Sequence, residues 1–210
     1  FACLAAFAPQ SADSRVEEDH LAPARKIWAG QYSDELLDVI DWCLKLDPDC
    51  AMAYWGISYA AGPNYNLPWY RYDPAGKAAA LAAAYDAMQG ALAHADAASP
   101  VERALIHALP ARYPQREAIE DQAPWDAAYA DAMREVFRAN RDDLEVREVF
   151  AASNLNLTPW KMWDLKTGGI AEGAGTAEAV EVLEGAFRDI PASWNHPGLL
   201  HLYVHLMEMS

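Results

Sequence analysis

Three polar side chains close to the end of the chain have the spacing of a metal site. His201, His205 and Glu208 are separated by four and three residues, which places them on one face of a helix. Two imidazoles and a carboxylate can hold a divalent transition metal such as Zn, Fe, Mn or Cu. His196 lies just before this set and is the candidate for a fourth ligand. The alternative is that these residues form only the polar face of an amphipathic helix.

Two asparagine pairs are the second set of candidates, and they belong to an internal repeat. Asn64 and Asn66 lie in N-Y-N-L-P-W, and Asn154 and Asn156 lie in N-L-N-L-T-P-W, 90 residues further along. Amide side chains both donate and accept hydrogen bonds, so these residues are candidates for orienting a ligand. The alternative is that they cap helix ends and anchor loops. A repeat at this spacing is expected of stacked helix pairs.

Aromatic side chains are concentrated in two segments, roughly 62–75, which contains Asn64 and Asn66, and 157–175, which follows Asn154 and Asn156. Long connections of this kind are often functional, and their aromatic content predicts that they fold back onto the protein. Trp160, together with Tyr203 beside the histidines, is a candidate for lining a ligand groove. Ordinary core and loop packing is the alternative for both.

The composition excludes several classes of protein. The chain has 210 residues, 53% of them hydrophobic, which is enough to build a core and argues against disorder. Its 31 acidic residues against 16 basic ones give a net charge of −15, which argues against nucleic acid and anionic membranes as partners. No apolar run approaches the roughly 20 residues that span a bilayer. Three cysteines form no complete disulfide framework.

The elements that must position the candidate residues are predicted to be helices throughout. Apolar residues recur at intervals of three and four residues, and no segment shows the alternation of apolar and polar residues typical of a strand. Ser99-Pro100-Val101-Glu102 is a strong start signal, with a capping serine, a proline at the first helical position and a glutamate that completes a capping box. His196-Pro197 is a similar signal. We expect helices near 21–30, 34–46, 51–61, 76–93, 100–112, 123–139, 142–154, 176–188 and 197–209.

Residues 34–59 resemble the tetratricopeptide repeat. They contain an amphipathic helix that ends in Leu46-Asp47-Pro48, followed by A-x-A-Y-W-G, which opens the next repeat. Further segments are similar to a group of large tetratricopeptide-repeat proteins: Gly62-Pro63-Asn64, S-P-V-E-R-A-L-I from position 99, and H-P-G-x-x-H-x-x-x-H from position 196. Members of that group often carry a histidine where this chain has Tyr32-Ser33. The resemblance implies an array of antiparallel helix pairs with a concave surface.

Both ends of the chain carry expectations of their own. Residues 1–20 form an N-terminal segment in which Ala6-Phe7-Ala8 could be a signal cleavage site, or a short apolar helix within the protein. We expect residues 21–210 to form the helical repeat domain, and further helices to follow Ser210. Cysteine usage favours the cytoplasm, while the A-x-A sequence leaves secretion open.

The predicted fold is therefore all-α, a tetratricopeptide-like array with two long ordered loops. The leading functional hypothesis is a scaffold that binds a protein, a small molecule or one divalent metal ion on its concave face. The alternatives are a metal-dependent enzyme that uses the His/Glu helix, and a scaffold that binds only proteins.

Overall fold

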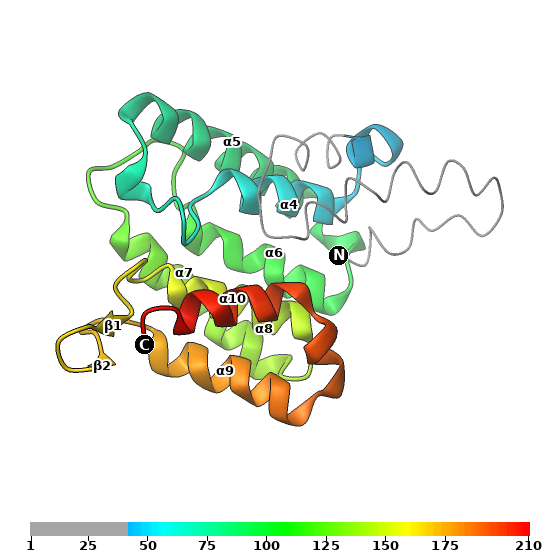
Figure 1. Ribbon diagram of the computed structural model, residues 1–210. Coiled ribbons are helices and arrows are strands. Elements are labelled where there is room, and N and C mark those ends of the chain that lie inside the picture. The colour runs from blue at the N-terminus through cyan, green and yellow to red at the C-terminus, as the bar shows by residue number, and fades with distance from the viewer. Residues whose placement is uncertain (1–41) are drawn as a thin grey trace, which may run out of the picture.

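The computed structural model describes residues 42–210, and this part of the chain is mostly helical (Figure 1). Short 3-10 turns lie at Trp69–Arg71, Ala95–Ala97 and Pro191–Asn195. The α-helices that the structure describes in full are α4 (Ala51–Ala61), α5 (Pro74–Ala93), α6 (Pro100–Arg112), α7 (Ala123–Ala139), α8 (Leu144–Leu155), α9 (Thr176–Asp189) and α10 (Pro197–Met207). The all-α prediction is confirmed.

Some predicted elements fall outside the described residues. These are the N-terminal segment 1–20, the helix at 21–30 and most of the helix at 34–46, of which residues 42–46 are described and helical. The five predicted helices from 51 to 154 and the two that follow agree with the structure to within about two residues at each end. None of the helices within residues 42–210 has both the length and the apolar character needed to cross a bilayer.

Consecutive helices pack against one another along the molecule. In Figure 1 the order runs from α4 and α5 at the top, through α6 and α7, to α8 and α9 at the bottom, with α10 drawn between α7 and α8. The last helix packs on both α8 and α9. One continuous hydrophobic core joins these elements, and it includes Phe150 of α8, Leu183 of α9 and Leu199 of α10. The start of α10 lies against the start of α8, because His196 Nε2 is 3.3 Å from Glu145 Oε1.

Side-chain caps account for where several helices begin. Asp73 accepts a hydrogen bond from the amide of Gly76 at 2.8 Å, and Asp143 accepts one from the amide of Val146 at 3.0 Å. Each cap satisfies a backbone donor that the helix itself leaves unpaired. At α6 the predicted capping box is present, because the Ser99 hydroxyl and the Glu102 carboxylate each accept from the other residue's amide.

We expect Ser99→Ala to lower the free energy of unfolding by about 1 kcal/mol, because one amide at the start of α6 loses its acceptor. Ser99→Thr keeps the hydroxyl and should lose much less. Urea unfolding followed by circular dichroism measures both. Equal losses in the two variants would contradict a role for the hydroxyl as cap.

A buried arginine anchors the segment that follows α4. The guanidinium of Arg112 donates to the carbonyl of Pro63 at 2.6 Å and to that of Tyr59 at 3.4 Å, at the end of α4. It also lies over the rings of Tyr59 and Tyr129, 4.6 and 5.1 Å from their centres. A cation at the C-terminus of a helix is stabilised by the helix dipole and by the free carbonyl groups.

The two predicted loops are ordered and meet each other. The ring of Tyr65 stacks on that of Trp160 with centres 4.9 Å apart, and the Tyr70 hydroxyl donates to the carbonyl of Pro159 at 3.5 Å. The second loop also contains a small hairpin, β1 (Trp163–Asp164) paired antiparallel with β2 (Gly169–Ile170), which the sequence did not predict. Strands of two residues are too short to show alternation in the sequence.

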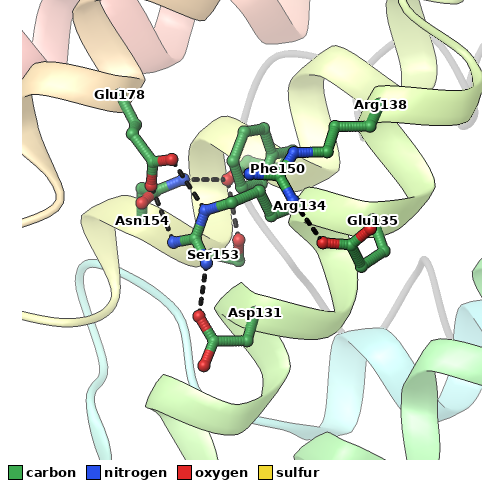
Figure 2. A network of polar contacts seen from close by, with 8 residues as sticks. All are labelled: Asp131, Arg134, Glu135, Arg138, Phe150, Ser153, Asn154 and Glu178. Carbon is green, nitrogen blue, oxygen red and sulfur yellow. Dashed lines mark hydrogen bonds and ion pairs between the residues drawn. The ribbon is translucent and has the colours of Figure 1, made fainter.

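Polar contacts join α7 to α9 beside the end of α8 (Figure 2). Arg134 of α7 donates from Nε and Nη2 to the two carboxylate oxygens of Glu178 on α9, both at 2.7 Å, and also pairs with Asp131. On α8, Asn154 Nδ2 donates to the carbonyl of Phe150 at 3.1 Å. A bidentate arginine–carboxylate pair fixes both partners in one geometry. The network therefore fixes the register of α7 against α9 beside the end of α8.

Candidate functional site

The first two turns of α8 and the start of α10 together form the strongest candidate metal centre. Glu145 and Glu148 are three residues apart and so share one face of α8. His196 is the N-cap of α10, which packs on α8. Ligand atoms of these three residues all lie within 4.8 Å of one another, and no other set of three such residues in the described part of the chain does so. We call this set the Glu-Glu-His cluster.

Within the cluster the polar atoms are only partly satisfied. His196 Nε2 lies 3.3 Å from Glu145 Oε1, and the His196 side chain is 9% exposed. Glu145 Oε2 is buried and has no hydrogen-bond partner. A buried carboxylate oxygen without a partner is costly, and a cation between the two glutamates would remove that cost.

Glu148 is pressed against the first turn of α10. A Cβ atom built at Gly198 would lie 2.3 Å from the carboxyl carbon and from Oε1 of Glu148. Any side chain at position 198 would therefore occupy the place of this carboxyl group. Gly198 leaves the space in which Glu148 can approach the helix N-terminus, where the dipole favours negative charge.

The electrostatics of the cluster favour a bound proton or another cation. Burial and the charge of Glu145 raise the pKa of Glu148 to about 7, against a smaller opposing effect of His196. Burial by itself would lower the pKa of His196, but the bond to Glu145 and the charge of Glu148 outweigh it and the pKa is raised. The carboxyl group of Glu148 thus exchanges its proton near neutral pH.

His196 has a second contact that fixes its neutral tautomer. Its Nδ1 accepts a hydrogen bond from the amide of Leu199 at 3.3 Å and so caps α10. A neutral ring that accepts at Nδ1 carries its proton on Nε2, the atom that faces Glu145. A metal ion at Nε2 must displace that proton, and moving it to Nδ1 would end the cap.

A second polar cluster surrounds the other end of α10. Glu208 Oε1 accepts from the Tyr65 hydroxyl at 3.2 Å and lies 3.0 Å from His205 Nδ1. The His205 ring is 4.5 Å, centre to centre, from both Tyr65 and His201. Trp160, the only non-glycine residue of the described chain with positive φ (63°), closes this cluster at 6.4 Å from His205. Burial and the neighbouring Glu208 raise the pKa of Tyr65, so its phenol stays protonated.

The structure divides the four metal ligands predicted from the sequence between these two places. His196 joins Glu145 and Glu148, whereas His201, His205 and Glu208 lie together at the other end of α10. Burial and the charge of His205 lower the pKa of His201, which keeps its ring neutral at pH 7. The local helical spacing placed the last three correctly on one side, but His196 belongs to a different cluster.

The four asparagines take different positions. Asn64 Oδ1 accepts from the amides of Asn66 and Leu67 and so holds its own turn, while Asn66 is exposed. Asn154 is 1% exposed, and its Oδ1 and that of Asn156 are buried without a partner. Asn64 therefore anchors its own loop.

The two aromatic candidates, Trp160 and Tyr203, also contact different parts of the protein. Trp160 lies on Tyr65 beside His205, as described above. The Tyr203 hydroxyl donates to Glu184 of α9 at 3.1 Å, and its ring meets Phe187 edge-on at 5.4 Å. Tyr203 therefore contacts α9, while Trp160 lies against the second cluster.

Sequence reasoning missed Glu145 and Glu148. The spacing E-x-x-E after the capping Asp143 marks two carboxylates on one face of α8. Nothing local connects them to His196, which is 51 residues from Glu145. Only the packing of α10 on α8 brings the three together.

Comparison of the chain with protein-family models, with curated proteins and with solved structures gave no match.

Proposed function

We propose that this chain is a tetratricopeptide-like helical scaffold that binds a divalent transition metal ion through Glu145, Glu148 and His196. The observation that carries the proposal is the convergence of these three ligand groups within 4.8 Å of one another. Two carboxylates at this spacing repel each other when both are ionised, and either a proton or a metal ion relieves the repulsion.

The donor set suggests which metals fit. Two carboxylates and one imidazole combine hard and borderline ligands, which suits Mn²⁺, Fe²⁺ and Zn²⁺ better than metals that need thiolates. The unpartnered Oε2 of Glu145 supports the same reading, since a metal ion would satisfy it. Ligands must be deprotonated to bind, so metal uptake should release the proton of Glu148.

Metal-dependent catalysis is the second candidate function. Three protein ligands leave coordination positions for water or a substrate, as in catalytic rather than structural zinc sites. Glu148 is partly exposed to solvent. A scaffold that binds only proteins is the remaining alternative, and it requires no metal.

The test is equilibrium dialysis of the purified chain against Mn²⁺ and Zn²⁺, with metal content measured by mass spectrometry. We expect binding at the cluster in the wild type and its loss in Glu145→Ala and in Glu148→Ala. Glu181→Ala, which changes an exposed carboxylate on α9, is the matched control and should bind like the wild type. Undiminished binding in both cluster variants would refute the proposal.

A further inference from the structure

The second cluster, at the C-terminal end of α10, holds a histidine whose tautomer follows from its hydrogen-bond partners. Glu208 Oε1 accepts from the Tyr65 hydroxyl and lies 3.0 Å from His205 Nδ1. A carboxylate only accepts, so His205 carries a proton on Nδ1. In the neutral ring the lone pair is then on Nε2, and this atom is buried with no hydrogen-bond partner.

This arrangement is the one that metal-binding histidines use. A ligand histidine coordinates through one ring nitrogen while the other donates to a carboxylate, which fixes the tautomer and the ring orientation. Glu208 supplies that carboxylate, and Tyr65 holds Glu208 in place from a loop 143 residues away. The free nitrogen of His205 is therefore oriented in advance and lacks only a partner.

His201 stands one helical turn before His205 and offers a second nitrogen. The two rings are perpendicular with centres 4.5 Å apart. His201 is partly exposed, so rotation of its side chain can bring a ring nitrogen and an incoming ion to His205 Nε2. Two histidines four residues apart on one helix face are a geometry that fits a single metal ion.

We infer that His201 and His205 form a second metal site, specific for ions that prefer imidazole nitrogen, with Glu208 as a positioning residue rather than a ligand. Zn²⁺, Ni²⁺ and Cu²⁺ belong to this class. The site is independent of the Glu-Glu-His cluster. Nine residues of helix separate His196 from His205, which is about 13 Å along the axis.

The test uses the wild-type chain labelled with ¹⁵N-histidine and titrated with Zn²⁺. Long-range ¹H–¹⁵N spectra report the tautomer of each histidine separately. Before metal is added, we expect His205 to be protonated on Nδ1. With Zn²⁺, the Nε2 signal of His205 and one nitrogen signal of His201 should shift together, while exposed His107 stays unchanged.

Variants separate the roles of the three residues. His201→Ala should weaken Zn²⁺ binding at His205 at least about tenfold, and Glu208→Ala by about 10- to 100-fold through loss of the positioning bond. Glu208→Gln keeps an acceptor for Nδ1–H and should restore most of the affinity. His107→Ala is the matched control for a surface histidine.

The outcomes also distinguish this site from the proposed function. If only His196 shifts with Zn²⁺, the Glu-Glu-His cluster binds metal and the second site is refuted. If His201 and His205 shift but His196 does not, the second site stands without the first. A proton on Nε2 of His205 in the metal-free chain, or a shift of similar size at all histidines, would overturn the inference.

Discussion

Replacing Glu148 by glutamine is expected to abolish most of the loss of stability that the wild type shows as the pH rises from about 4.5 to about 7. The pKa of Glu148 is raised from 4.5 to about 7 in the folded chain. Between these values the folded state holds a proton that the unfolded state has released, so the free energy of unfolding falls with rising pH. The total loss is on the order of 2–3 kcal/mol.

The direction of this pH dependence distinguishes Glu148 from an ordinary ion-paired carboxylate. A carboxyl group whose pKa is lowered by folding contributes stability that is lost as the pH falls, whereas Glu148 is most favourable when protonated. Glutamine mimics the protonated form at every pH, so the variant should be more stable than the wild type at pH 8. The raised pKa of His196 acts in the same direction and leaves a smaller residual slope.

Urea unfolding at pH 5, 6, 7 and 8 measures the effect, with Glu181→Gln as the control for an exposed glutamate. If the unfolding free energy of Glu148→Gln follows the wild-type curve at all four pH values, the pKa of the Glu148 carboxyl group is not raised by folding. Saturating Mn²⁺ should flatten the wild-type curve as well, because the metal replaces the proton that Glu148 holds.

The helices could be predicted from the sequence because their signals are local. The capping box at Ser99 and the prolines at the first turns of α6 and α10 are read within a few residues, and the structure has the helices there. The contact of His205 with Glu208 is equally local, since residues three apart in sequence lie on the same face of a helix.

The Glu-Glu-His cluster could not be predicted because it is made by tertiary packing. Glu145 and His196 meet only where α10 lies on α8, and Tyr65 reaches Glu208 across most of the described chain. Sequence spacing specifies which residues share a helix face, but it does not specify which helix covers that face. His196 was therefore assigned to its nearest neighbours in sequence, while its contacts lie on another helix.

Gly198→Ala is expected to weaken metal binding at the Glu-Glu-His cluster by about 10- to 100-fold while leaving the fold intact. The added Cβ would fall 2.3 Å from the carboxyl group of Glu148, which must move away. That group is the end of a flexible side chain and can rotate toward solvent. Alanine is also the better helix former, so the start of α10 gains on the order of 0.5–1 kcal/mol.

The variant therefore separates the site from the fold, which removal of a ligand residue does not do. The free energy of unfolding of Gly198→Ala should depend less on pH, as in Glu148→Gln, because the displaced carboxyl group is hydrated again and has its ordinary pKa. Gly185→Ala in α9 is the matched control. A Cβ there would meet its nearest atom, Arg147 Nη1, at 3.4 Å, an ordinary contact.

Dialysis against Mn²⁺ and urea unfolding at pH 5 and 8, carried out on both glycine variants, check the two halves of this prediction. Retained Mn²⁺ affinity in Gly198→Ala would mean that Glu148 does not need its present position to bind metal. A loss of several kcal/mol in unfolding free energy would mean instead that α10 cannot accept the methyl group. The expected result is weak metal binding in a stable chain. It would mean that position 198 needs glycine to leave room for the Glu148 carboxyl group, and that the helix itself does not need it.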